Sequence, residues 1–231
     1  NAVPIAISLR ERKHRTISTG LRFGTDEGIG MLGAWEHRNM RGMGERLMLR
    51  GTTAQNEIGL GAEYVFPYFR RDDQTLALTF SARQDMLDAY DSLGVDLGAR
   101  VSRTISERLE VSGGIMLKVR DVEQRGKTRR FELLSTPFEA TWRTADSDLN
   151  PTQGIRLRGL VAPYLGPESV FLKTDVEWVN YLPLDKGKTW VLATRLRAGS
   201  LLGASLDDVP AFERFYAGGG GSIRGYQYQS V

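Results

Sequence analysis

Long segments that alternate apolar and polar residues constrain this chain of 231 residues more than any other feature. In residues 188–203, for example, Leu192 and Leu196 share one face of an extended strand, whereas Arg195 and Arg197 share the other. A period of two residues is typical of a strand with one apolar face, and it differs from the helical period of about 3.6 residues. The pattern therefore predicts an all-β antiparallel fold in which hairpins join consecutive strands.

The alternating segments predict about eleven strands before the last thirty residues of the sequence. They are residues 16–24, 28–37, 45–53, 56–67, 74–85, 91–103, 107–121, 129–143, 153–164, 168–182 and 188–203. The stretches between them are rich in Gly, Pro, Asn and Asp, as in residues 150–154, and these residue types favour tight turns. The first alternating stretch, residues 3–10, is separated from the others by the charged residues 10–13 and is expected to belong to a preceding domain.

Strand length helps to separate a membrane barrel from a soluble β-sandwich, because both show the same alternation. Strands of soluble sheets average about five to six residues, whereas a tilted strand needs about nine to eleven to cross a bilayer. The predicted strands match the longer class and carry aromatic residues near their ends, as in the girdles of membrane barrels. These aromatic residues are Tyr64, Phe66, Tyr68, Phe69, Tyr164, Tyr181 and Trp190. The sequence favours a transmembrane β-barrel, and a soluble β-sandwich is the alternative.

The residue types present argue against covalent or metal chemistry. The chain has no cysteine and only two histidines, His14 and His37, so neither a thiol nucleophile nor a His/Cys metal site can form. Residues 146–150 resemble the start of a calcium-binding loop, but a proline follows where glycine is required. Asp85 and Asp88 are expected at a loop tip, where carboxylates are usually solvated. We expect no enzyme activity, metal or cofactor, and no nucleic-acid partner, since Lys and Arg are not clustered.

A glycine-rich stretch begins after Phe215 and leads to a single arginine, Arg224. Glycine allows positive φ and close packing of the backbone, so this loop can fold back and place Arg224 in an enclosed space. A buried guanidinium keeps its charge and offers several donors to carboxylates. No phosphate-binding glycine motif fits residues 218–225. A surface hairpin is the alternative.

Motifs that share an order along nearly the whole chain carry a family resemblance. They are Glu11-Arg12-Lys13, Thr25-Asp26-Glu27-Gly28, Trp35-Glu36-His37-Arg38-Asn39, Gly42 with Gly44-Glu45, Phe66-Pro67-Tyr68-Phe69, Asn150-Pro151-Thr152 with Gly154, and Gly218-Gly219 with Ser222-Ile223-Arg224-Gly225-Tyr226. In these motifs the chain resembles the BamA/TamA superfamily of outer-membrane assembly factors, and most closely its TamA branch. The last motif is the most specific signature of the superfamily. The resemblance implies a location in the bacterial outer membrane, in contact with its lipid.

The resemblance also implies a barrel of about sixteen strands that follows periplasmic POTRA domains. In such a barrel the signature loop lies between the eleventh and twelfth strands, which agrees with the eleven strands predicted before it. The chain is then expected to be a fragment. Residues 1–13 would be the end of a POTRA domain and a linker, and residues 14–231 a partial barrel domain. Its first and last strands, 16–24 and 188–203, would be open edges.

Two functional elements follow from the resemblance. The first is the loop formed by Gly218, Gly219, Ser222, Ile223, Arg224, Gly225 and Tyr226. Its arginine is expected to hold the loop against the inner wall of the barrel, where Asp175 and Glu177 are candidate partners. The second is a lateral-gate strand with Thr16, Gly20 and Gly24. Its exposed backbone edge can pair with an incoming strand, and glycine weakens the pairing it already has.

The function implied is the insertion or secretion of outer-membrane and autotransporter proteins. The expected partners are these substrates in their unfolded form and a TamB-like protein that spans the periplasm. A BamA-type insertase, a two-partner secretion pore and a passive porin are the alternatives.

Overall fold

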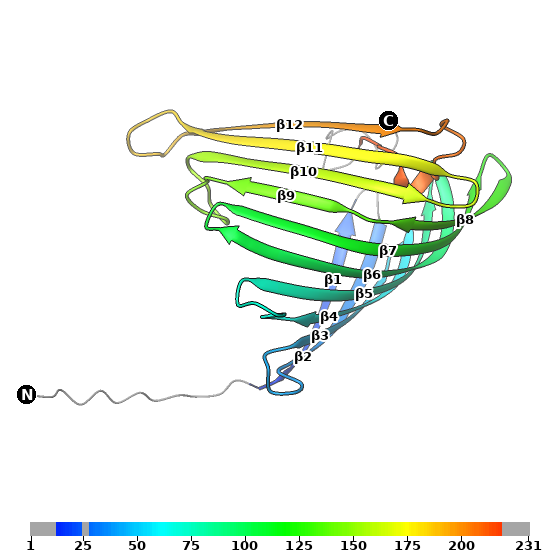
Figure 1. Cartoon of the computed structure of the whole chain (residues 1–231), viewed down its shortest axis with the longest axis horizontal. Helices are drawn as coiled ribbons and strands as arrows, with labels where there is room; N and C mark the ends of the chain where they lie inside the picture. The colour runs from blue at the N-terminus through cyan, green and yellow to red at the C-terminus, as the bar shows by residue number, and fades with distance from the viewer. Residues whose placement is uncertain (1–12, 25–27, 219–231) are drawn as a thin grey trace, which may run out of the picture.

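The computed structural model describes residues 13–24 and 28–218, which form one curved antiparallel sheet (Figure 1). Its strands are β1 (Arg15–Gly24), β2 (Gly28–Arg38), β3 (Arg46–Thr53), β4 (Glu57–Phe66), β5 (Gln74–Leu87), β6 (Tyr90–Ser106), β7 (Leu109–Gln124), β8 (Lys127–Ser135), β9 (Phe138–Arg143), β10 (Gly154–Leu165), β11 (Val170–Pro183) and β12 (Val191–Leu202). A single-turn 3-10 helix, η1 (Ala211–Glu213), follows. No helix in the described part of the chain is long and apolar enough to cross a membrane.

The twelve strands occupy eleven positions in the sheet, because β8 and β9 share the place between β7 and β10. The break between them contains Pro137, which has no amide hydrogen for the ladder. Its carbonyl still accepts a hydrogen bond from the Gly114 amide at 3.0 Å, so the interrupted strand stays in place. The predicted strand 129–143 is therefore correct in position and wrong in being continuous, and the eleven predicted strands correspond to the eleven positions that the twelve strands occupy.

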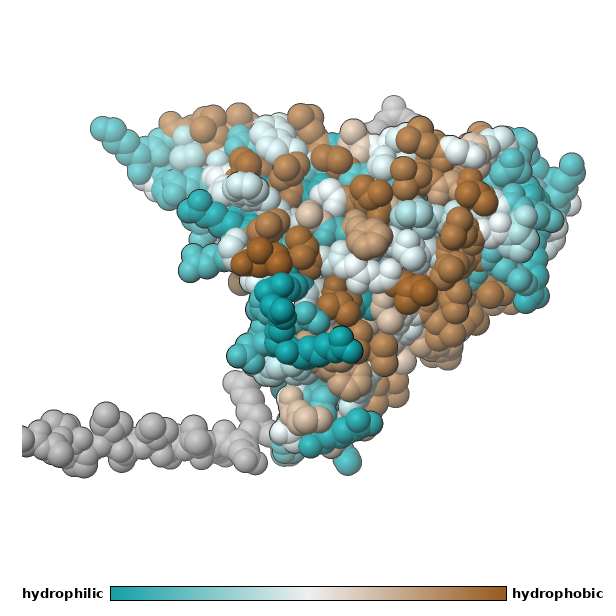
Figure 2. Space-filling model, in the orientation of Figure 1, coloured by the Kyte–Doolittle hydropathy of each residue, from teal (hydrophilic) through white to brown (hydrophobic). Residues whose placement is uncertain are grey.

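The outward face of the sheet is apolar from strand to strand. A continuous row of residues lies side by side in register across β1 to β7: Ile17, Trp35, Leu49, Ala62, Phe80, Leu97 and Leu117. Figure 2 shows hydrophobic side chains spread over the outer face of the strands nearest the viewer. Directly opposed residues of antiparallel strands point to the same side, so each strand gives its alternate residues to this face. Exposed apolar side chains in a band around a closed or curved sheet are what lipid contact requires.

The sheet has two open edges within the described residues. β1 pairs only with β2, and β12 pairs only with β11. The predicted open edges at 16–24 and 188–203 are thus confirmed for this part of the chain. An edge strand presents unpaired backbone amide and carbonyl groups, which are a template for pairing with a further strand.

Candidate functional site

The chain folds back over the concave face of the sheet after β12, and we call residues 203–218 the inner segment (Figure 1). Gly203 makes the turn with a φ of 96°, which favours glycine. Val209 and Ala211 are then buried at 2% and 1% exposure against the inner wall. The wall residues in this cluster come from β6, β7, β8, β10 and β11: Tyr90, Val122, Phe131, Leu133, Ala162, Tyr164 and Phe171. The inner segment is therefore part of the only sizeable apolar core found among the described residues.

Glu213 is the electrostatic centre of this contact. Its side chain is 3% exposed and receives donors from three strands of the inner wall. Lys118 of β7 donates to Oε1, while Lys173 of β11 and the Tyr164 hydroxyl of β10 donate to Oε2 at 3.1 and 2.8 Å. A buried carboxylate costs free energy unless it is paired and hydrogen-bonded, and here both oxygens have partners. We call these four side chains the Glu213 clamp.

The charge of Glu213 is stabilised by its partners. Burial on its own would raise the pKa of this carboxyl, but the ammonium groups of Lys118 and Lys173 outweigh burial, and the pKa of Glu213 is lowered. The carboxylate therefore stays ionised at neutral pH. A group whose pKa is lowered on folding contributes stability that is lost as the pH falls through the lowered value.

Phe212 is held by a second buried network. The guanidinium of Arg120 lies over its ring, 4.9 Å from the centroid. Arg120 itself is 4% exposed and pairs with Asp96 of β6 and, at 3.4 Å, with Asp85 of β5. Asp85 also accepts a hydrogen bond from Ser92 at 3.0 Å. A cation over an aromatic ring contributes more when both are removed from water, so this network fixes the ring in place.

The expectation that Asp85 lies at a solvated loop tip is wrong. Asp85 belongs to β5, points inward and is 6% exposed, because it pairs with Arg120 and Arg83. Asp88 lies in the turn after β5 and is exposed, as expected. The sequence contained one sign of this inward position. Asp85 and Arg83 are two residues apart in an alternating strand, so their side chains lie on the same face.

Further contacts tie down both ends of the inner segment. Arg129 donates to the backbone carbonyl of Asp207 at 2.7 Å. Arg214 donates to the carbonyl of Val209 at 2.9 Å and to Gln124 at 3.3 Å. The segment is thus bound to β7 and β8 by polar contacts as well as by its apolar core.

Asp175 and Glu177 point inward from β11, in line with their predicted orientation. They lie between arginines of the neighbouring strands β10 and β12. Glu177 pairs with Arg156 at 2.9 Å and with Arg195 at 2.6 Å. Asp175 pairs with Arg197 at 2.8 Å, while its Oδ1 has no hydrogen bond from any described residue. These carboxylates already neutralise arginines of β10 and β12, and their pairing with Arg224 stays a prediction.

The signature loop itself lies largely outside the described residues. Gly218 is described and has a φ of 108°, in the region that favours glycine. Gly219, Ser222, Ile223, Arg224, Gly225 and Tyr226 are beyond it. The inner segment leads directly into this loop, so the Glu213 clamp fixes the point on the inner wall from which the loop starts.

The predicted gate residues lie on the edge strand β1. The Thr16 hydroxyl accepts a hydrogen bond from Arg38 at 3.3 Å. Gly20 faces inward beneath the side chain of Leu32, which would lie 3.1 Å from a Cβ atom at this position. Gly24 is the last residue of β1 and lies opposite Gly28. The structure places all three along one free edge, and their role in gating stays a prediction.

The segment compared with a calcium-binding loop is a turn. Asp146 accepts hydrogen bonds from the backbone amide and the side chain of Thr152, which hold its pKa below the ordinary value. Lys188 of the next turn also reaches Asp146, at 3.3 Å. Within 13–24 and 28–218 no group of three or more metal-ligating side chains lies together.

Gly199 makes room for the inner segment and offers a first test of its docking. A Cβ atom at this position would lie 2.3 Å from the Phe215 ring, so Gly199→Val should push Phe215 off the inner face of β12. We expect the docked segment to lose about 1–3 kcal/mol, measured as faster hydrogen exchange in residues 209–217. Gly159→Val is the matched control, because a Cβ atom there meets nothing within 4 Å. Equal hydrogen exchange in Gly199→Val and Gly159→Val would contradict the docking of the inner segment against β12.

One family model and two relatives in sequence match most of this chain. The Omp85 superfamily domain matches residues 39–231. The outer membrane protein assembly factor BamA of Nitratidesulfovibrio vulgaris is 25% identical over 241 residues, covering 99% of this chain and 30% of the relative. BamA of Neisseria meningitidis is 24% identical, covering 97% of this chain and 32% of the relative. The chain thus spans about a third of the length of these relatives.

Solved structures show the same fold. The crystal structure of BamA from Haemophilus ducreyi lacking POTRA domains 1–3 superposes with a TM-score of 0.86 at 18% identity, over 96% of this chain and 47% of that one. CdiB from Escherichia coli superposes with a TM-score of 0.62 at 14% identity, over 95% and 46% of the two chains. The predicted outer-membrane β-barrel fold, the outer-membrane location and the superfamily are confirmed. The chain belongs to the Omp85 superfamily, and it forms part of a membrane barrel.

Proposed function

We propose that this chain is the membrane-embedded part of a factor that assembles or translocates other proteins of the outer membrane. The observation that carries the proposal is the match of most of the chain to the Omp85 superfamily domain, together with two relatives that are outer membrane protein assembly factors. The unfolded outer-membrane proteins on which such a factor acts are the proposed substrates. Outer-membrane lipid is proposed to surround the apolar outer face of the sheet.

The proposed mechanism uses strand pairing and no covalent chemistry. The free edge of β1 offers a row of backbone donors and acceptors, with apolar Ile17 and Leu21 on the outward side at 76% and 78% exposure. An incoming strand that pairs with this edge satisfies its own backbone and buries its apolar side chains against lipid. Both contributions favour insertion, so the factor needs neither a nucleotide nor a catalytic residue.

The inner segment supports this mechanism by fixing the point on the inner wall from which the signature loop starts. The Glu213 clamp joins β7, β10 and β11 to the start of the loop. Arg224 is proposed to fix the rest of the loop against the same wall. The loop would then keep the inner wall in a defined shape while the edge strand exchanges partners.

The narrower proposal places the chain in the TamA branch, with autotransporters among its substrates and a TamB-like protein as its periplasmic partner. The motifs from Glu11 to Tyr226 support this placement. The rival within the superfamily is a BamA-type insertase, which the two curated relatives favour. Reading the coding sequence upstream of Asn1 separates the two by the number and type of POTRA domains.

A cysteine on β1 tests the pairing mechanism in the full-length protein. Residues 1–231 contain no cysteine, so Gly20→Cys introduces the single thiol of this part of the protein. We expect it to form a disulfide with a cysteine in the terminal strand of a substrate barrel during assembly, detected as a mixed adduct on a non-reducing gel.

The control is Gly61→Cys in β4, a strand that β3 and β5 pair on both sides. An adduct at Gly20→Cys and none at Gly61→Cys supports strand templating by β1. Equal adducts at both positions, or none at either, would rule it out. A protein that forms open channels and gives no adduct would instead be a passive porin.

A further inference from the structure

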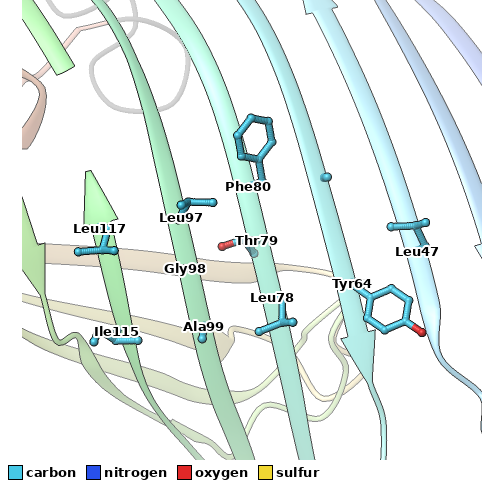
Figure 3. Close-up of a pocket in the computed structure, with 11 residues that line it drawn as sticks. Leu47, Tyr64, Leu78, Thr79, Phe80, Leu97, Gly98, Ala99, Ile115 and Leu117 are labelled. Atoms are coloured by element: carbon cyan, nitrogen blue, oxygen red, sulfur yellow. The ribbon is translucent and has the colours of Figure 1, made fainter. Parts of the chain in front are cut away.

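An apolar groove runs over the outward face of the strands from β3 to β7 (Figure 3). Its walls are mainly large apolar side chains: Leu47, Leu78, Phe80, Leu97, Ile115 and Leu117. The small residues Ala62, Gly98 and Ala99 also line it, and they leave space that larger side chains would fill. Because this face of the sheet lies toward the bilayer, the groove is open to the hydrocarbon of the membrane.

Polar atoms without partners mark one end of the groove. Tyr64 lines the groove, and Figure 3 shows its ring extending toward the strand that carries Leu47. Its hydroxyl oxygen is buried and has no hydrogen-bond partner among the described residues, and the same is true of Nδ1 of His37. The strand register places His37 opposite Leu47, and Leu47 opposite Tyr64, so all three share the outward face.

Arg15 adds a charged group to the row of His37 and Tyr64, at the edge of the sheet. It lies opposite His37 on β1 and is exposed. No described residue forms an ion pair with its guanidinium, which makes it a cation on the lipid side of the sheet. The ring of Trp35 lies 5.9 Å from that of His37, at the same end of the strands. Aromatic and basic side chains in such positions are typical of the level at which lipid headgroups lie.

We propose that this surface binds one phospholipid with an anionic headgroup. One acyl chain lies in the groove over Ala62 and Ala99, and the phosphate meets Arg15, His37 and Tyr64. A buried polar atom without a partner costs free energy, and phosphate oxygens can accept hydrogen bonds from Tyr64 and His37 once these side chains turn from their buried positions toward the headgroup. Arg15 gives a preference for a headgroup with net negative charge, because a zwitterionic lipid carries its own cation. The site is close to β1, so the bound lipid borders the free edge of the sheet.

Native mass spectrometry of the full-length protein, titrated with phosphatidylglycerol after extraction in detergent, tests the proposal. We expect one phosphatidylglycerol molecule to bind more tightly than the rest and more tightly than phosphatidylcholine. Arg15→Gln should weaken this first site about fivefold, since a basic residue near the headgroups contributes roughly that factor. Ala62→Leu should weaken it by filling the groove. Tyr64→Phe removes only the hydroxyl oxygen, so it should weaken binding without a change in shape.

Ala140→Leu is the matched control, because Ala140 lies on β9, away from the groove, and is exposed opposite Gly159. It should leave the first binding constant unchanged. Equal weakening by Ala62→Leu and Ala140→Leu, or equal binding of the two lipids, would mean an ordinary lipid annulus and overturn the proposal. Lipid binding is measured without any substrate protein, so this inference and the proposed assembly function can each fail alone.

Discussion

Trypsin should cleave after Arg214 in Glu213→Gln and leave this bond intact in the unaltered protein. The substitution keeps the shape of the side chain and removes the charge that Lys118 and Lys173 share. Removing one partner from a buried ion pair costs about 3–5 kcal/mol, because the remaining charges stay buried without compensation. If about 3 kcal/mol of this affects docking of the inner segment, the open population rises roughly 100-fold. The measurement is the rate at which the fragment ending at Arg214 appears, followed by mass spectrometry.

Asp207→Asn is the control for this prediction, since it removes the same charge from an exposed position of the inner segment. Its side chain forms no hydrogen bond with any described residue, and Arg129 binds its backbone carbonyl instead. We expect cleavage of this variant at the rate of the unaltered protein. Similar rates in Glu213→Gln and Asp207→Asn would show that the clamp does not hold the segment.

The pH dependence of the same contact has a defined sign. Because the folded state lowers the pKa of Glu213, the stability that it contributes is present above the ordinary carboxyl range and is lost on acidification. A spin label on Leu206→Cys, at a residue that is 67% exposed, should therefore gain mobility as the pH falls below about 4. In the background of Glu213→Gln the same label should be mobile throughout. If the mobility of the label depends on pH equally with Glu213 and with Gln at this position, groups other than Glu213 cause the change.

The strands and their orientation were predictable because the alternation is long and regular. The row from Ile17 to Leu117 and the inward position of Asp175 and Glu177 follow directly from the period of two residues. Two features were not predictable in this way. The break at Pro137 depends on one missing amide in a strand that otherwise alternates. The burial of Asp85 depends on partners from β6 and β7, which the register of these strands places next to it.

The inner segment shows where sequence reasoning reaches its limit. Its residues 203–218 have no periodicity, so no pattern indicates that they return to the inner wall. Glu213 is one acidic residue in a stretch that reads as a loop, and its partners Lys118 and Lys173 are 95 and 40 residues away along the chain. An apolar pair next to a carboxylate, as in Ala211 and Phe212, is a weak signal of burial. Only the strand register from β7 through β8 and β10 to β11 identifies the site.

Arg120→Met should lower the free energy of unfolding of the barrel by about 3–5 kcal/mol, the largest effect expected for a single residue of the inner wall. The methionine fills similar space but, among the described residues, leaves Asp96 with no cation and Asp85 with only Arg83. It also removes the guanidinium from the Phe212 ring. The measurement is the midpoint of urea unfolding for protein folded in lipid vesicles, taken with the unfolding slope.

Two further variants decide whether the loss comes from uncompensated charge. Asp96→Asn combined with Arg120→Met should recover much of the lost stability, because it removes the carboxylate that the single variant leaves buried. Arg100→Met removes an inward arginine of β6 that is exposed and has no ion pair with any described residue, so its effect should stay within about 0.5 kcal/mol. A double variant less stable than Arg120→Met alone would mean that the arginine acts through packing. Equal losses in Arg100→Met and Arg120→Met would mean that the buried network adds nothing beyond an ordinary inner-wall charge.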